Sequence, residues 1–203
     1  MIVLDGILYG IGLLVTGAVA AYFLHPALGV PFFLLAGFCL WFFRDPNRDI
    51  PTGNIAVSPA DGKVVAVVKE NDQTRISIFL NVFDVHVNRS PIAGKVVDVQ
   101  YQKGQFLVAS KEEASADNEQ SVITVEDGRG SRVVFKQIAG LIARRIICSV
   151  KPGDSIAIGD RIGLIKFGSR CDVLLGPEWD INVQIGQRVT AGVTVLANRH
   201  DTD

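Results

Sequence analysis

Gly168 and Ser169 interrupt a segment, Leu164 to Val173, that otherwise alternates like a half-buried strand. A glycine inside a strand marks a bend or a place where another group approaches the backbone closely. The local pattern therefore favours a bend between two strands. The other interpretation is that the peptide bond between Gly168 and Ser169 is itself the functional group, and the rest of the chain must distinguish the two.

Composition and charge exclude several classes of protein. The 203 residues include 20 Lys and Arg and 21 Asp and Glu, so the net charge is −1 and gives no sign of a nucleic-acid-binding surface. Cys39, Cys148 and Cys171 are an odd number of cysteines, without the nearby Cys or His partners of a zinc site. We expect no nucleic-acid partner, no metal and no disulfide.

An apolar segment without Lys, Arg, Asp or Glu extends over residues 7–43, and His25-Pro26 breaks it near the middle. Because about 20 apolar residues suffice to cross a bilayer core, we predict two helices, at about residues 8–24 and 30–43. The hairpin of residues 1–43 is expected at the cell membrane, spanning it or lying within one leaflet, with the following domain in the cytoplasm. A helical pair buried against the rest of the protein is the alternative.

The pattern changes after residues 44–54, which are rich in Pro, Asn and Gly and are expected to form a linker. Residues 55–203 contain short β-branched runs separated by turn residues, which predicts a mainly β barrel or sandwich. Residues 111–118 are the only segment of this part that favours a helix, and they fit a mobile charged loop equally well. The segment 150–162 matches 183–195 at every third position, as in the strand-turn-strand units of lipoyl-like barrels. Neither unit has the cofactor-bearing Lys of a swinging-arm carrier.

Six sequence blocks, in consistent order, resemble the phosphatidylserine decarboxylase proenzymes, and most of all their short, compact subgroup. The resemblance spans about residues 42–197 and is more specific than any single motif. The blocks are "FFRDPNRDIP" (42–51), "SPADGKV" (58–64), "FLNVFDVHVNRSPIAGKV" (79–96), "QIAGLIARRI" (137–146), "GDRIGLIKFGSR" (159–170) and "DVLLGP" (172–177).

The resemblance implies that the proenzyme cleaves itself between Gly168 and Ser169, into chains of residues 1–168 and 169–203. Ser169 Oγ would attack the carbonyl carbon of Gly168, and elimination and hydrolysis would then leave a covalent pyruvoyl group, the cofactor, at position 169. Glycine suits this attack because a backbone without Cβ reaches strained geometries readily. The resemblance further implies that phosphatidylserine is decarboxylated to phosphatidylethanolamine through a Schiff base with this pyruvoyl group.

The serine hydroxyl needs a base, and the chain contains three histidines. His25 lies in the apolar hairpin and His200 in a polar C-terminal segment, which leaves His86. A histidine in a strand is more often structural, but elimination and the family resemblance together favour a catalytic role for His86. Asp61 of "SPADG" would be its orienting carboxylate, although an Asp-Gly pair is equally typical of a turn.

One position departs from the family pattern. Many members have a second histidine three residues after the first, and this chain has Arg89 there. Either His86 serves both self-cleavage and decarboxylation, or Arg89 has a supporting electrostatic role. Arg side chains also suit a phosphodiester and a carboxylate, so the candidates for substrate binding are Arg89, Arg144, Arg145 and Lys166. Strand alternation allows at most one of Arg144 and Arg145 to face the site.

Two alternatives to this enzyme stay open. One is a non-catalytic, membrane-anchored lipoyl-like barrel that binds lipid or acts as an adaptor, although the long heptad helices typical of such adaptors are absent from the sequence. The other is a decarboxylase acting on an archaeal ether-lipid phosphoserine. The expected partner is a membrane phospholipid, and the sequence is also compatible with a homodimer.

Overall fold

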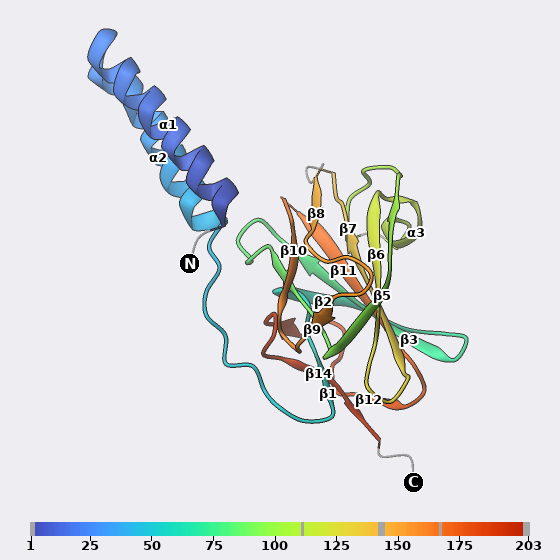
Figure 1. Ribbon diagram of the computed structural model, residues 1–203. Coiled ribbons are helices and arrows are strands. Elements are labelled where there is room, and N and C mark those ends of the chain that lie inside the picture. Colours follow the sequence, from blue (N-terminus) through green and yellow to red (C-terminus); the bar gives the residue numbers. More distant parts are fainter. Residues whose placement is uncertain (1–2, 111, 142–144, 167, 201–203) are drawn as a thin grey trace. The chain divides into compact units, whose positions relative to one another are not determined.

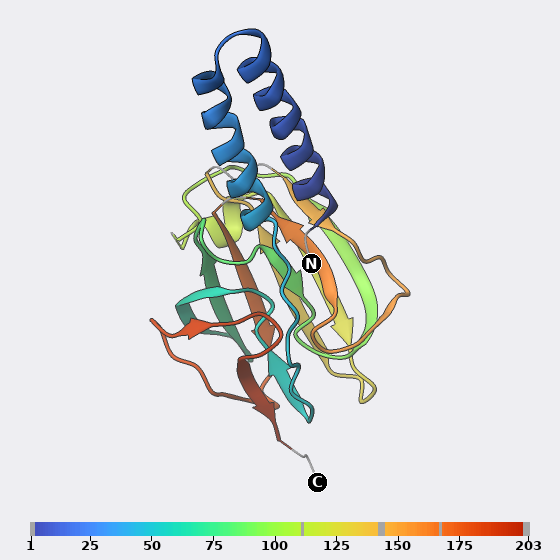
Figure 2. The same cartoon turned by 90° about the vertical axis from the view of Figure 1, so that its left-hand side faces the viewer.

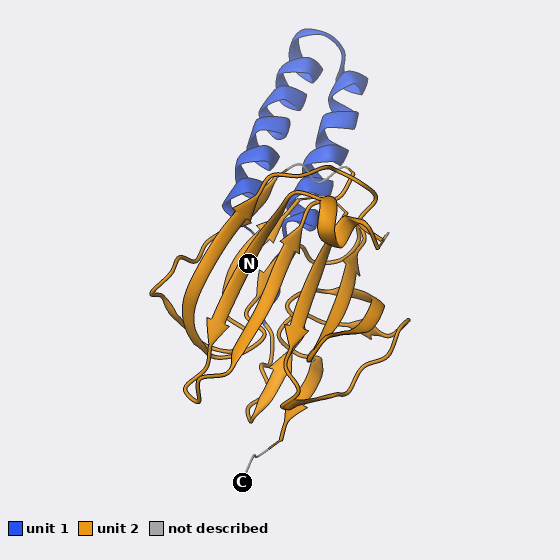
Figure 3. Ribbon diagram, turned by 90° about the vertical axis from the view of Figure 1, so that its right-hand side faces the viewer, with its two compact units in different colours: residues 1–47 blue, residues 48–203 orange. Residues whose placement is uncertain are grey.

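The computed structural model describes residues 3–110, 112–141, 145–166 and 168–200. The chain divides into two compact units, Met1–Asn47 and Arg48–Asp203 (Figure 3). The boundary between the units falls inside the segment 44–54 that the sequence predicts to be a linker. Each unit is described by itself below.

The first unit is a pair of helices, α1 (Leu4–Phe23) and α2 (Pro26–Phe42). The second helix begins earlier than residue 30, where the sequence prediction put its start. Two features explain the earlier start: His25 Nδ1 accepts a hydrogen bond from the backbone N–H of Ala27 at 3.2 Å, and proline occupies the first helical position, where it needs no hydrogen-bond donor.

Glycines let the two helices approach closely. A Cβ atom at Gly29 would lie 2.7 Å from the carbonyl oxygen of Gly17, and one at Gly10 would lie 2.9 Å from a methyl carbon of Leu40. Large apolar side chains are exposed along both helices, and α1 is long and apolar enough to cross a membrane. Both features fit the expectation of a membrane-associated hairpin.

The second unit is mainly β, as the sequence predicts, with one short helix inside the predicted segment 111–118 (Figure 1). Its elements are β1 (Ile55–Val57), β2 (Gly62–Glu70), β3 (Gln73–Leu80), β4 (Val87–Arg89), β5 (Gly94–Gln102), α3 (Ala114–Asp117), β6 (Gln120–Glu126), β7 (Arg132–Ile138), β8 (Ile146–Cys148), β9 (Ser155–Ile156), β10 (Arg161–Ile165), β11 (Ser169–Leu175), β12 (Trp179–Ile181), β13 (Arg188–Val189) and β14 (Val195–Arg199).

The strands form three sheets among the described residues. The large sheet has the order β13-β2-β3-β11-β7-β6-β5-β9, and the two small sheets have the orders β1-β14-β12 and β4-β10-β8. Figures 1 and 2 show that the large sheet is strongly curved. Its inner face supplies alternating apolar residues to one core, among them Ile76 and Ile78 of β3, Phe135 of β7 and Val173 of β11.

The β unit is an internal duplication of seven strands. Seven strands of one copy correspond, in order, to seven strands of the other: β1, β2, β3, β11, β12, β13 and β14 correspond to β4, β5, β6, β7, β8, β9 and β10. Under this correspondence the strand order of each small sheet becomes that of the other, and the strand order of the large sheet is reversed. The bulges match as well. The register between β2 and β3 shifts between Val64 and Ala66, and that between β5 and β6 shifts at the corresponding places, Val96 and Asp98.

The sequence carries traces of this duplication beyond the 150–162 and 183–195 repeat. "SPADGKV" begins at Ser58 and "SPIAGKV" at Ser90, and each serine hydroxyl donates a 2.6 Å hydrogen bond to a carbonyl two residues ahead. The matched glycines of the longer repeat, 153 with 186 and 159 with 192, all have positive φ. The repeat is therefore structural.

One copy is inserted into the other. The second copy, β4 to β10, is continuous, whereas the first is split into β1–β3 and β11–β14. The second copy joins β6 to β7 by the short turn 127–131, while the first copy joins β3 to β11 through the whole second copy. Residues 81–86 and 166–168 are the two links that enter and leave this insertion, and the predicted cleavage site lies on the second link.

A larger residue at the helix contact tests the first unit. We expect Gly29→Val to weaken the α1–α2 pair by about 1–3 kcal/mol, because the added side chain meets backbone that cannot move aside. The measurement is the thermal melt of the helical circular-dichroism signal in micelles. Gly37→Val is the matched control, since a Cβ there has nothing within 4 Å. Equal loss in both variants would contradict the glycine contact.

Candidate active site

The two links between the copies meet at one corner of the β unit. Ser169, the first residue of β11, pairs with Leu80, the last residue of β3. On the adjoining small sheet the backbone N–H of Ile165 donates to the carbonyl oxygen of His86 at 3.4 Å. Residues 81–86 therefore carry the chain from the large sheet to the small sheet, and the chain returns from β10 to β11 of the large sheet at the same corner.

A buried polar layer fixes the alignment of the two sheets. Asn88 pairs with Gly163 on the small sheet. Its amide donates to Cys171 Sγ at 3.4 Å, and its Oδ1 accepts from Gln137 Nε2 at 2.9 Å. Residues two positions apart on a strand face the same side. His86 lies two residues before Asn88, and Ser169 lies two residues before Cys171. Alternation therefore directs the side chains of His86 and Ser169 to the same interior face as those of Asn88 and Cys171.

Ser169 is buried, and its hydroxyl makes no hydrogen bond within the described part of the chain. Buried hydroxyl groups normally find a partner, so a buried serine without one suggests a chemical rather than a structural role. Gly168 before it has φ +59°, a backbone conformation that glycine adopts without steric cost.

The carbonyl group of Gly168 is confined by the segment that follows β7. A Cβ atom at Gly140 would collide with the carbonyl oxygen of Gly168 and would lie 3.1 Å from Ala109 Cβ. Gly140 therefore permits a close approach of two backbones at the Gly168 carbonyl. The sequence analysis did not single out Gly140, although it lies within the quoted block "QIAGLIARRI".

His86 is buried, and its Nδ1 lies 2.9 Å from the carbonyl oxygen of Asp84. A carbonyl oxygen only accepts hydrogen bonds, so in this contact Nδ1 carries the proton and Nε2 is the basic nitrogen of the neutral ring. This is the arrangement that a general base requires. The other histidines have structural contacts: His25 caps α2, and His200 bonds to Pro177 and Asp180.

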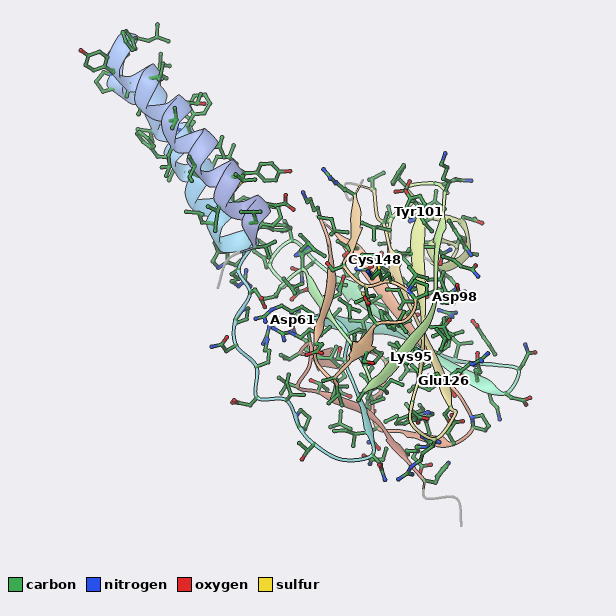
Figure 4. All side chains as sticks on the ribbon, in the orientation of Figure 1. Asp61, Lys95, Asp98, Tyr101, Glu126 and Cys148 are labelled. Atoms are coloured by element: carbon green, nitrogen blue, oxygen red, sulfur yellow. The ribbon has the colours of Figure 1, made fainter. Side chains whose placement is uncertain are left out.

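Asp61 lies apart from Lys95 and Glu126 in the β unit (Figure 4). Its carboxylate accepts hydrogen bonds from Arg48 at 2.8 Å and from the backbone N–H of Ala191 at 2.8 Å. No hydrogen bond joins Asp61 to His86 in the described residues, so the direct contact between them stays a prediction.

The internal duplication tests whether the turn itself requires an acid at Asp61. The matching residue in the second copy is Ala93, and a glycine follows each of them at the start of β2 and β5. The second copy therefore builds the same turn without an acid. A requirement of the turn does not explain Asp61.

The four candidate cations have different environments. Arg89 is buried, and its Nη1 donates to the carbonyl oxygen of Gly159 at 3.0 Å, on the side of β4 that alternation places away from His86. Lys166 is buried beside the corner, and its backbone N–H donates to the carbonyl of the exposed Arg145 at 3.3 Å. Arg144 lies outside the described residues.

A second Gly-Ser-Arg sequence occupies the equivalent position in the second copy. Gly130-Ser131-Arg132 begins β7 as Gly168-Ser169-Arg170 begins β11, and Gly130 also has a positive φ, +81°. Ser131, however, is partly exposed, and its hydroxyl accepts a 2.7 Å hydrogen bond from Arg199. The sequence analysis missed this match, although the repeated tripeptide is visible in the sequence.

Cys171 is the only cysteine directly in line with Ser169 on β11. Burial raises the pKa of its thiol strongly, and the neighbouring Asp172 carboxylate adds to this rise. The thiol therefore stays protonated and does not compete with Ser169 as a nucleophile. No group of three or more His, Cys, Asp or Glu side chains among the described residues is arranged to hold a metal ion.

Known proteins resemble this chain over most of its length. A family model described as phosphatidylserine decarboxylase matches residues 35–197. A phosphatidylserine decarboxylase proenzyme of Solibacter usitatus (strain Ellin6076) is 61% identical over 200 residues, which cover 98% of each chain. Proenzymes of the same name from Solidesulfovibrio magneticus and Citrifermentans bemidjiense are 49% and 48% identical, over 87% and 88% of this chain and 86% of each relative.

A methyl group at Gly140 tests the geometry of the scissile carbonyl. We expect Gly140→Ala to slow cleavage of the 168–169 bond by about tenfold or more, because the added Cβ displaces the carbonyl that Ser169 must reach. The measurement is a time course of intact mass after synthesis. Gly128→Ala is the control, because a Cβ there has nothing within 4 Å. Cleavage of Gly140→Ala at the rate of Gly128→Ala would refute the proposed geometry.

Proposed function

This chain belongs to the phosphatidylserine decarboxylase family, and we propose that it makes its pyruvoyl group from Ser169 and converts phosphatidylserine to phosphatidylethanolamine. The observation that carries the assignment of Ser169 is its buried hydroxyl, which has no hydrogen-bond partner in the described residues and follows a glycine with φ +59°. The equivalent Ser131 has neither the burial nor the unoccupied hydroxyl.

Self-cleavage begins when Ser169 Oγ attacks the carbonyl carbon of Gly168. The hydroxyl proton passes to a base and then to the nitrogen of residue 169, and the peptide bond becomes an ester. The base next removes the Cα proton of residue 169. The ester C–O bond breaks, Gly168 leaves as a carboxylate, and a dehydroalanine remains. Tautomerisation to an imine and hydrolysis by one water release ammonia and leave the pyruvoyl group.

His86 is our candidate for this base, and we assign it to both self-cleavage and decarboxylation. Strand alternation directs it to the same interior face as Ser169, and the contact of Nδ1 with Asp84 leaves Nε2 as the basic nitrogen. Arg89, at the position where many relatives have a second histidine, instead bonds to the carbonyl oxygen of Gly159.

Asp61 remains our candidate for the carboxylate that stabilises the imidazolium form of His86. The support is indirect: the second copy forms the same turn with Ala93, so the fold does not require an acid there. A negative charge that persists close to a histidine favours its protonated form. Arg48 and the backbone of Ala191 hold the carboxylate of Asp61 in one position.

The pyruvoyl group supplies a ketone that condenses with the substrate amine and accepts the electrons left behind when carbon dioxide departs. The residues around it bind and orient the substrate. Lys166 and Arg145 at the corner are our candidates for the phosphodiester and the carboxylate. The apolar hairpin of residues 1–43 would keep the catalytic unit at the membrane that contains its lipid substrate.

The first experiment measures whether the chain is cut and where. Wild type is expected to separate into two chains, the smaller covering the 35 residues 169–203 (203 − 168 = 35), with a mass of about 4 kDa and an N-terminus blocked to Edman chemistry. Ser169→Ala is expected to remain whole. Ser131→Ala is the control and should be cut normally. If wild type also stays whole, the enzyme assignment fails and a lipid-binding protein becomes the better explanation.

A second experiment tests the base. His86→Gln is expected to slow self-cleavage by about 10² to 10⁴-fold, the usual contribution of a general base. His200→Gln is the matched control, because that side chain bonds to Pro177 and Asp180. Intact mass over time gives both rates. If His86→Gln is cut as fast as His200→Gln, another group is the base.

A further inference from the structure

A buried charged network lies on the opposite face of β11 from the reaction. Arg170 and Asp172 alternate with Ser169 and Cys171, and both charged side chains are fully buried. Two charges on the back of the catalytic strand are not needed for any step of the reaction described above. They are also costly, because a buried charge must be paired and hydrogen-bonded to be tolerated.

The network satisfies this requirement with short contacts. Arg170 Nε donates to Asp172 Oδ1 at 2.7 Å, and Arg170 Nη2 donates to Ser77 Oγ at 2.6 Å. Arg75 Nη1 donates to the same hydroxyl at 2.7 Å and lies 3.8 Å from Asp172 Oδ2. Ser115 donates a further hydrogen bond to Asp172. The side chain of Arg170 is therefore tied both to its own strand and to β3.

The carboxylate of Glu112 contacts this network from its solvent-exposed side. Glu112 accepts a hydrogen bond from Arg75, and its Oε2 lies 3.5 Å from Arg170 Nη2. Glu112 is 60% exposed and lines a pocket of about 440 Å³ together with Glu70 and Lys136. Burial would lower the pKa of Arg75, but the hydrogen bonds to Glu70 and Glu112 and the charge of Asp172 outweigh it and raise that pKa.

The second copy shows that the fold does not require this network. Arg132 is equivalent to Arg170 and follows the same Gly-Ser pair. Its side chain is 66% exposed and contacts Glu126, which is 35% exposed, at 2.8 Å. The residue equivalent to Asp172 is Val134. The buried network is therefore particular to the copy that is expected to be cut.

We propose that Arg170 is a positioning residue that holds the pyruvoyl group in place once the bond to Gly168 is gone. This inference rests on the proposed function. Before the cut, residue 169 is fixed by its covalent link; afterwards it is the first residue of a chain, and chain ends fray unless they are tied down. Residue 169 pairs on one side only, with Leu80, whereas Arg170 pairs with both Phe79 and Ile138.

The loss of the backbone N–H of residue 169 makes the contacts of Arg170 more important. Conversion of Ser169 to a pyruvoyl group removes the N–H of that residue, and with it any hydrogen bond that the N–H makes to β3. The nearest remaining attachment of the reactive carbonyl groups is the backbone and side chain of Arg170. A guanidinium that makes directed hydrogen bonds to Asp172 and Ser77 fixes both position and rotation, which a single point charge does not.

The test separates self-cleavage from turnover. Arg170→Lys keeps the buried charge but loses the two directed contacts, and Arg132→Lys is its matched control in the second copy. We expect Arg170→Lys to cleave within about threefold of wild type, because the covalent link still positions Ser169. We expect its kcat to fall by about ten- to a hundredfold, with KM nearly unchanged, on phosphatidylserine in mixed micelles. Arg132→Lys should match wild type in both.

A second measurement distinguishes misplacement from general damage. Phenylhydrazine reacts with the exposed ketone of a pyruvoyl group, so we expect it to inactivate Arg170→Lys faster than wild type at equal thermal stability. The inference is overturned if kcat is unchanged, or if kcat, cleavage rate and melting temperature fall together. If wild type itself is neither cut nor active, the proposed function fails instead, and the outcome is recognisable without any Arg170 variant.

Discussion

The antiparallel pairing of β3 with β11 is the interaction on which the rest of this structure depends. It joins Leu80 to Ser169 although 88 residues separate them in sequence (169 − 80 − 1 = 88). Because strand pairing rather than the peptide bond at 168–169 holds β11 in the sheet, the chain can be cut there and keep its fold.

The duplication explains where the chemistry lies. The insertion of one copy into the other creates two links that cross between sheets at one corner, and His86 and Ser169 lie at the ends of these links. A tight turn such as 127–131 exposes its serine to solvent and to Arg199. Ser169 at the start of β11 is instead buried, which would keep water away from the ester of the proposed self-cleavage.

The same Gly-Ser-Arg tripeptide thus occurs in two environments. At Gly130 it completes a hairpin turn, and at Gly168 it lies against Gly140 with a buried charge network behind it. Local sequence is nearly the same, so burial, hydrogen-bond partners and the close approach of another backbone account for the difference. The environment of a Gly-Ser pair is in this sense a tertiary property, even though the two residues are adjacent in sequence.

The sequence by itself determined the mainly β class, the apolar hairpin and the candidates Ser169 and His86. The fold class and the hairpin follow from periodicity and hydropathy, which are local signals. Ser169 follows from the family resemblance, and His86 from that resemblance together with the scarcity of histidine. Only the tertiary structure decided which partners Asp61 and Arg89 contact, that Gly140 confines the Gly168 carbonyl, and that Arg170 is buried while Arg132 is exposed. The physical reason is that each of these depends on segments distant in sequence being brought together by strand pairing, and no local pattern specifies which distant segment a residue will meet.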